Sequence, residues 1–198
     1  MPKRLFDIVL AAAGLVLAAP LMLVLAAWIK LDSPGPVFFR QERVGRHGRA
    51  FLIHKFRTMR HDPAGLGPQI TVGGDARITR AGAFLREAKL DELPQLLDVL
   101  RGAMSLVGPR PEVPRYIAFY PEALREKILS VRPGITDIAS IEYRRESELL
   151  ARADDPERAY VEQVLPEKLR YAEQYVDAAS MWLDIRLLWR TLRVVLTH

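Results

Sequence analysis

The sequence predicts a mainly α-helical protein with a small β-hairpin and a membrane-embedded helix near its N-terminus. Three observations support this fold class: an uncharged apolar run over residues 8–29, leucines at helical spacing over residues 93–100, and two short apolar stretches around a glycine-rich turn at residues 45–48. A chain of 198 residues can bury one sizeable core. We therefore divide it into an anchor, residues 1–31, and one folded domain, residues 32–198.

The apolar run over residues 8–29 contains no charged residue and no Ser, Thr, Asn or Gln. At about 1.5 Å per residue, a helix of this length would cover a bilayer core of about 30 Å. However, Pro20 divides the run into halves too short to cross alone, and both flanks are basic, with Lys3 and Arg4 before it and Lys30 after it. Because basic flanks stay in the cytoplasm, we expect a re-entrant helix-break-helix that enters and leaves on one face.

Two alternatives for this run stay open, a plain spanning helix and a cleaved signal peptide. A signal peptide has a shorter apolar core and a cleavage site of small residues. The best candidate site, at residues 17–19, is followed directly by Pro20, which makes it a poor one.

Charge is distributed unevenly along the chain. The net charge is +5, and residues 1–62 hold ten Lys and Arg against four Asp and Glu, which leaves the remainder near −1. A basic region beside an apolar segment indicates binding to an anionic membrane surface. Nucleic acid is the rival partner, but the sequence contains no recognisable nucleic-acid-binding motif, so we expect none to bind. There is no cysteine, which excludes disulfides and a thiol nucleophile.

Residues 37–40 and 51–56 are predicted to be the two strands of the hairpin. Lys55 and Arg57 alternate with apolar neighbours, so they are expected on one strand face. Taken alone, this pattern is typical of an edge strand protected by charge.

Leu93, Leu96, Leu97 and Leu100 predict an amphipathic helix. Pro94 is tolerated only in a first helical turn, which puts Asp91 at or next to the N-cap. A carboxylate there stays ionised, and the same helix end can hold phosphate, as an aspartyl nucleophile requires. The alternative is that Asp91 only caps the helix and that Glu92 is an ordinary surface residue of it. A cap does not need the nearby positive charges, which are Arg86, Lys89 and Arg110.

Residues 89–112, KLDELPQLLDVLRGAMSLVGPRPE, closely resemble the core signature of the bacterial sugar transferases. These are monotopic phosphoglycosyl transferases, which start glycan assembly on a polyprenol phosphate and have a re-entrant anchor. Residues 38–59 and 75–90 resemble the family as well. The chain departs from it at Ala19, where a Ser is common, and at residues 137–144, which leaves the geometry of the break and the identity of the sugar open.

The resemblance implies transfer of a sugar-1-phosphate from a UDP-sugar to polyprenol (undecaprenyl) phosphate, with release of UMP. Asp91 would be the nucleophile, and Glu92 a metal ligand or base. Mg²⁺ is the expected cofactor, held by Asp91 and Glu92, because it prefers carboxylate and phosphate oxygens. Between its two prolines, Arg110 is a candidate phosphate clamp. The expected substrate-binding residues are Lys55, Arg57, Arg86, Arg110, Pro111 and Arg132.

The implied location is the cytoplasmic face of the bacterial inner membrane, with membrane lipid as a further partner and a homodimer left open. Two alternatives are a glycosyltransferase that releases UDP and a non-enzymatic membrane adaptor. The released nucleotide separates the first from the proposed reaction, and loss of turnover on mutation separates the second.

The rest of the domain is expected to be helical. Residues 61–74 are predicted to be a loop, residues 112–130 one or two helices broken at Pro121, and residues 145–177 helices interrupted by Asp155-Pro156 and by Pro166. In the last segment, apolar residues lie on one side with arginines beside them, which suits an interfacial helix as well as a core-packed one. Because the chain also has an apolar anchor at its other end, we expect an interfacial helix. The apolar set is Trp182, Ile185, Trp189, Leu192 and Leu196, and the basic set is Arg186, Arg190 and Arg193.

Overall fold

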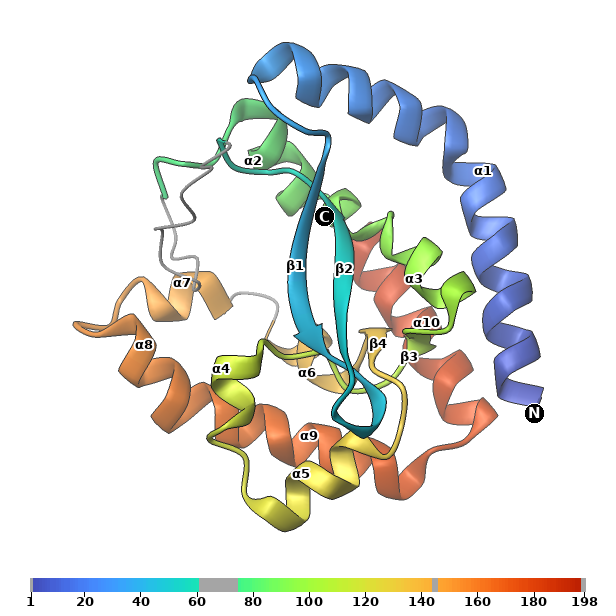
Figure 1. The fold of residues 1–198 in the computed structure, drawn as a ribbon, viewed down its shortest axis with the longest axis vertical. Helices are drawn as coiled ribbons and strands as arrows, with labels where there is room; N and C mark the ends of the chain where they lie inside the picture. Colours follow the sequence, from blue (N-terminus) through green and yellow to red (C-terminus); the bar gives the residue numbers. More distant parts are fainter. Residues whose placement is uncertain (1, 61–74, 144–145, 197–198) are drawn as a thin grey trace.

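The computed structural model describes the chain except for residues 1, 61–74, 144–145 and 197–198, so the predicted loop at 61–74 lies outside the described residues. Helices surround a central β-hairpin, and the long N-terminal helix runs along the outside of the molecule (Figure 1). The prediction of a mainly helical fold with a small antiparallel hairpin is confirmed.

Helix α1, Pro2–Asp32, is continuous through Pro20 and bends along its length (Figure 1). It is long and apolar enough to cross a membrane. Ala11, Leu25 and Ile29 are buried against the domain, whereas Leu17 and Leu31 are more than four-fifths exposed. The helix therefore packs on the domain along one side and presents apolar side chains on the other.

Polar contacts hold the first turns of α1 against the domain. The buried carboxylate of Asp7 accepts hydrogen bonds from the Ser105 hydroxyl, at 2.9 Å, and from the Leu106 backbone N–H, at 3.2 Å. Lys3 donates to Asp184 at 2.5 Å, and the Arg4 guanidinium donates to the carbonyl of Val99 at 2.7 Å. These bonds link the basic flank before the apolar run to three different elements of the domain.

The hairpin pairs β1, Phe38–Val44, with β2, Ala50–Phe56, and its register sets Phe39 opposite Lys55. His54 ties this hairpin to the next helix. The Asp98 carboxylate accepts from the His54 backbone N–H at 2.9 Å and contacts the His54 Nδ1 at 2.6 Å, while Arg101 donates to Nε2 at 3.1 Å. The neighbouring residue, Lys55, is thereby held at a set place relative to that helix.

Helix α2, Arg80–Glu87, has Thr79 as its N-cap, and a 3₁₀ turn, η2, follows at Leu90–Glu92. Helix α3, Gln95–Arg101, begins only after this turn, with Pro94 at its N-cap position. The prediction that Asp91 is at or next to the N-cap is therefore wrong. Without an N–H, Pro94 fits at the helix start, and the chain forms the tighter 3₁₀ turn before it.

A second sheet was not predicted from the sequence. The short strands β3, Ser105–Val107, and β4, Gly134–Thr136, pair in parallel. At the end of this pair, the two backbones approach so closely that a Cβ on Gly134 would lie 2.1 Å from the Gly108 nitrogen. Glycine is required at this contact because any side chain would collide with backbone.

The remaining elements are helical and follow the predicted boundaries except at Pro166. Pro121 is the N-cap of α5 and Asp155 caps α8, as expected for breaks at these prolines. Pro166 does not break the chain, because the wider π-helical turn η3 precedes it and it lies in the first turn of α9. The elements are α4 Pro114–Ile117, α5 Glu122–Leu129, α6 Ile138–Glu142, α7 Glu146–Leu150, α8 Pro156–Ala159, η3 Tyr160–Val164 and α9 Leu165–Ala178.

The C-terminal helix α10, Met181–Leu196, packs on the domain through its inner face, where Asp184 and Leu187 are buried. On its outer face, Trp182 is 67% exposed and Trp189 62% exposed, and Ile185 and Leu192 are exposed too. The predicted apolar side therefore faces away from the core, which excludes the core-packed alternative for these four residues.

Candidate active site

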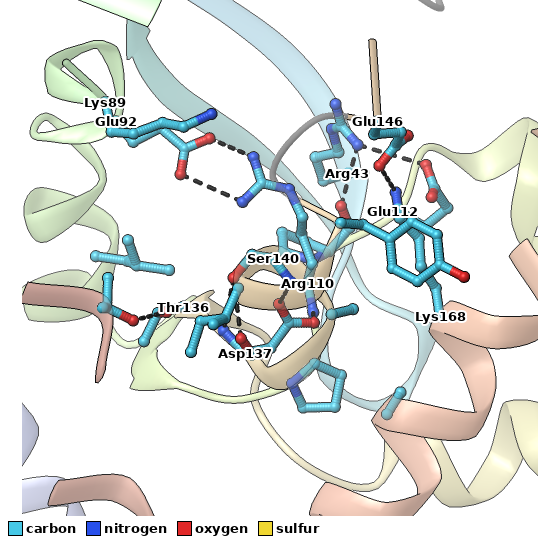
Figure 2. A pocket seen from close by; sticks show the side chains of 18 of the residues that line it. Arg43, Lys89, Glu92, Arg110, Glu112, Thr136, Asp137, Ser140, Glu146 and Lys168 are labelled. Carbon is cyan, nitrogen blue, oxygen red and sulfur yellow. Dashed lines mark hydrogen bonds and ion pairs between the residues drawn. The ribbon is translucent and has the colours of Figure 1, made fainter. Parts of the chain in front are cut away.

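A cavity of about 890 Å³ opens between the hairpin, η2, the turn after β3 and helices α6, α9 and α10. The segment identified from the sequence contributes much of its lining (Figure 2). Six of the predicted site residues line this cavity, which are Lys55, Arg86, Asp91, Glu92, Arg110 and Pro111.

The η2 turn that carries both carboxylates begins at an unusual backbone conformation. Lys89 has φ 56° and ψ 23°, in the left-handed region that non-glycine residues seldom adopt. Such conformations persist where the surrounding fold holds them, and they cluster at functional sites. Here the reversal lets the chain leave α2 and turn Asp91-Glu92 toward the hairpin.

Glu92 is the centre of a charge cluster built from three elements. Its carboxylate accepts from the Lys55 ammonium of β2 at 2.8 Å. It also receives both terminal nitrogens of Arg110, one of them at 3.2 Å, in a bidentate pair (Figure 2). Burial by itself would raise the pKa of Glu92, but the charges and hydrogen bonds of Arg110 and Lys55 outweigh it and hold the pKa well below its usual range. Glu92 is therefore ionised and occupied by its two cations.

Asp91 differs from its neighbour in having no partner. Within the described part of the chain, its carboxylate makes no hydrogen bond and no ion pair. Burial and the adjacent Glu92 charge raise its pKa, against the opposing charges of Lys55, Arg110 and Arg86. A carboxylate that is half-buried, unpaired and close to positive charge is free to react or to take a ligand.

The turn that carries Arg110 is held by residues that the sequence did not single out as site residues. The Asp137 carboxylate accepts from the Arg110 backbone N–H at 3.3 Å, and Arg43 donates to the Pro111 carbonyl at 3.0 Å. Asp137 also caps α6 through a reciprocal pair with Ser140. An Asp followed three residues later by Ser was the available signal for this cap, whereas nothing local in the sequence connects Arg43 of β1 to the turn.

Two predicted substrate-binding residues have structural contacts instead. Arg57 is 4% exposed, and its guanidinium donates to the carbonyl of Ser33 at 2.7 Å, to that of Ile29 at 3.3 Å and to that of Pro34. Arg132 donates to the Gly102 carbonyl at 3.0 Å. Neither residue lines the cavity. Strand β2 ends at Phe56, so the alternation that would put Lys55 and Arg57 on one face stops before Arg57.

The far side of the cavity is polar and aromatic. The Tyr160 hydroxyl donates to Glu112, the Lys168 ammonium lies 4.9 Å from the Tyr160 ring centre, and Lys168 pairs with Glu146 at 2.5 Å. Tyr143 and Ser140 line this part as well. The stretch that departs from the family pattern, residues 137–144, therefore contributes to the cavity wall.

The donor set limits what metal this site can hold. Among the described residues, no three His, Asp or Glu side chains cluster in a way that could bind an ion. Asp91 offers free carboxylate oxygens, and Glu92 lies next to it. Mg²⁺ is often held by one or two carboxylates together with phosphate oxygens of the substrate and water. The residues present fit that kind of site.

Comparison with known sequences gives consistent results. The sequence model of the family described as "Bacterial sugar transferase" matches residues 1–198. The chain is 41% identical to a UDP-glucose:undecaprenyl-phosphate glucose-1-phosphate transferase from Xanthomonas campestris pv. campestris, over 94% of this chain and 37% of the relative. It is 39% identical to a UDP-N-acetylgalactosamine-undecaprenyl-phosphate N-acetylgalactosaminephosphotransferase from Aeromonas hydrophila, over 98% and 44%.

The chain thus spans less than half of these two relatives. It is also 40% identical to the exopolysaccharide production protein PSS from Rhizobium leguminosarum bv. phaseoli, over 99% of this chain and 96% of that protein. The match to the family over the full sequence agrees with the geometry of the Asp91-Glu92 turn and the Arg110 turn. The chain belongs to the bacterial sugar transferase family.

Proposed function

We propose that this protein is a transferase that moves a sugar-1-phosphate from a UDP-sugar to undecaprenyl phosphate and releases UMP, as the first membrane step of glycan biosynthesis. The observation that carries the proposal is the unpaired Asp91 carboxylate beside the Glu92–Lys55–Arg110 cluster in a large cavity. Two of the relatives that resemble the chain are named for UDP-sugars and undecaprenyl phosphate.

In the proposed first step, an Asp91 oxygen attacks the phosphorus that bears the sugar. A bond forms between this oxygen and phosphorus, the bond from phosphorus to the bridging oxygen breaks, and UMP leaves with the electron pair. Attack by an anion on a diphosphate requires that its charge be neutralised and its atoms be aligned. Arg110 and Lys55 supply positive charge, and Glu92 holds both cations in place.

In the proposed second step, an oxygen of the lipid phosphate attacks the same phosphorus, and the Asp91 carboxylate leaves unchanged. The product is polyprenol diphosphosugar. Asp91 and, after rearrangement of its pairs, Glu92 are the residues that would hold Mg²⁺, which supplies neutralisation of phosphate charge when bound.

The proposed membrane placement follows from two exposed apolar surfaces. The outer side of α1 and the outer face of α10 both present large apolar side chains, and Trp with Arg beside it suits the headgroup layer. In this proposal α1 bends at Pro20, enters and leaves on the cytoplasmic face of the inner membrane, and sets the cavity at the level of the lipid phosphate.

The covalent intermediate is tested by intact-protein mass spectrometry after incubation with Mg²⁺ and UDP-glucose without lipid acceptor. Wild-type protein should gain the mass of one sugar phosphate and release UMP, whereas Asp91→Asn should fold normally, gain no mass and lose turnover by several orders of magnitude. If wild-type protein turns over but is never modified, and UMP appears only when both substrates are present, direct attack by the lipid phosphate replaces this mechanism. Release of UDP would identify a different glycosyltransferase.

The re-entrant topology is tested with single cysteines at two exposed positions on either side of the apolar run, Pro2→Cys and Arg49→Cys. Neither of the replaced side chains forms a buried ion pair. Lys3 is not used as a labelling position because its ammonium contacts the buried Asp184. We expect an impermeant thiol reagent to label the two cysteines equally, both in intact cells and in inverted vesicles. Opposite accessibility would establish a spanning helix.

A further inference from the structure

The cavity lies between two separate hydrophobic clusters of the domain. Lining residues Leu96, Ile135 and Ile141 pack with the cluster that includes Leu187 of α10. Lining residues on the opposite side pack with the cluster centred on α5, η3 and α9, and these are Tyr116, Tyr143, Tyr160 and Leu169. Figure 2 shows Arg110 between Thr136 on one side and Glu146 and Lys168 on the other.

We call the first side the α10 compartment, lined by Leu96, Ile135, Thr136, Ile141, Thr191 and Val194. Its two polar side chains bond to each other, since the hydroxyls of Thr136 and Thr191 lie 2.6 Å apart. This bond takes up one donor and one acceptor of the two hydroxyls, the rest of the lining side chains consists of methyl and methylene groups, and none of the six is charged. The compartment is therefore suited to hydrocarbon.

The opposite side, the tyrosine compartment, is lined by Glu112, Ser140, Tyr143, Glu146, Tyr160 and Lys168. It carries two carboxylates, an ammonium and three hydroxyls in the space next to Arg110. A hydrocarbon chain there would desolvate these groups without replacing their hydrogen bonds, whereas a sugar or nucleoside can replace them.

The α10 compartment is also one helix away from the surface proposed to meet the bilayer. Thr191 and Val194 face the cavity, and Trp189 and Leu192 of the same helix are exposed on its outer face. A lipid whose tail lies in the membrane at α10 would reach the cavity along this helix without passing the charged side.

The geometry points to separate compartments for the two substrates, which deepens and rests on the proposed function. The prenyl units next to the lipid phosphate occupy the α10 compartment, and the sugar and nucleoside of the donor occupy the tyrosine compartment. Burial of the prenyl carbons next to Thr191 and Val194 supplies binding free energy through the hydrophobic effect. After UMP has left, the lipid phosphate enters the vacated position in line with the Asp91–phosphorus bond, while its prenyl units lie in the α10 compartment.

Because the reaction is proposed to have two half-reactions, each compartment can be tested alone. Val194→Phe fills the α10 compartment with apolar volume. We expect it to be loaded from UDP-glucose at the wild-type rate, measured as UMP released without lipid, while the apparent KM for undecaprenyl phosphate rises at least tenfold. Thr191→Ile fills the same space from the preceding turn and should reproduce the result if Val194→Phe folds poorly.

Lys168→Gln is the matched variant of the tyrosine compartment and should show the reverse pattern, with slower loading and an unchanged apparent KM for the lipid. An unchanged lipid KM in both α10-compartment variants, or a loading rate that falls as much as lipid transfer, would overturn the assignment. Failure of the proposed function looks different, since wild-type protein would then not be loaded at all.

Discussion

Two groups of cations that were predicted from the sequence to bind substrate make different contacts in the structure. Lys55 and Arg110 meet in the cavity on a single carboxylate, Glu92. Arg57, two residues after Lys55, instead donates to carbonyls at the end of α1, and Arg132 donates to a carbonyl after α3. The first pair faces space that a substrate can enter, and the second has its hydrogen bonds within the fold.

This difference shows what makes a cation available for substrate. A guanidinium that donates to backbone carbonyls already uses its N–H groups within the fold. Removing it leaves those carbonyl acceptors without this donor. A cation held by one carboxylate at the wall of a cavity keeps donors for a phosphate while its orientation is set. The variants below separate the two cases, in order of decreasing expected effect on turnover.

Arg110→Lys should lower kcat/KM by about 100-fold to 1000-fold, because an ammonium keeps the charge but cannot form the bidentate pair or aim two donors at a phosphate. Steady-state UMP release measures this effect. Thermal unfolding should be close to wild type, since the charge beside Glu92 is retained. A variant with near-normal kcat/KM would show that Arg110 only neutralises Glu92.

Lys55→Met should lower kcat/KM at neutral pH by about 10-fold to 100-fold, the equivalent of one charged hydrogen bond. It should also change the pH profile. Asp91 must be ionised to attack, so activity falls as the pH drops through its pKa, and the Lys55 charge holds that pKa down against the effect of burial. Removing Lys55 should therefore move the acid limb of kcat/KM to higher pH.

Arg86→Gln is the control for this profile, because the Arg86 charge lowers the Asp91 pKa less than the charges of Lys55 and Arg110 do, and Arg86 has no direct bond to Glu92. Its acid limb should move in the same direction by less. A limb that stays in place in Lys55→Met, or moves to lower pH, would separate Lys55 from the ionisation of Asp91.

Arg57→Met should leave kcat of the folded protein within a few-fold of wild type but lower its stability. Carbonyls of Ile29, Ser33 and Pro34 lose a donor, and each such hydrogen bond contributes about 1 kcal/mol. At roughly 2–4 °C per kcal/mol for a chain of this size, the melting temperature in detergent should fall by several degrees. If the variant is as stable as wild type but has lost turnover, Arg57 binds substrate, as predicted from the sequence.

Arg132→Met should have the smallest effect. Its hydrogen bond to Gly102 joins two half-buried groups, and a bond of this kind contributes about 1 kcal/mol. Both kcat/KM and the melting temperature should therefore stay close to wild type, as measured in the same assays. A loss comparable to that of Arg110→Lys would mean that Arg132 moves to the cavity when substrate binds.

Local patterns were sufficient to predict most helices and the hairpin, and they pointed to the segment that we propose carries the chemistry. Apolar periodicity marks α3 and the two-faced α10, and a glycine-rich turn between apolar stretches marks β1–β2. The Asp91-Glu92 pair and the Arg110 turn stood out because both lie in one motif that resembles the core signature of the family. The helix and turn patterns depend on neighbours within a few residues, so the sequence contains that information directly.

Tertiary structure decided which predicted residues reach the cavity and what each carboxylate does. Strand β2 ends before Arg57, the 3₁₀ turn separates Asp91 from α3, and the contact between Gly108 and Gly134 aligns a parallel pair too short to leave a pattern. From the sequence, Asp91 and Glu92 are adjacent acids with the same neighbours. Only the fold brings Lys55 and Arg110 onto Glu92 and leaves Asp91 unpaired, because contacts between residues 18 and 37 positions apart depend on how whole elements pack.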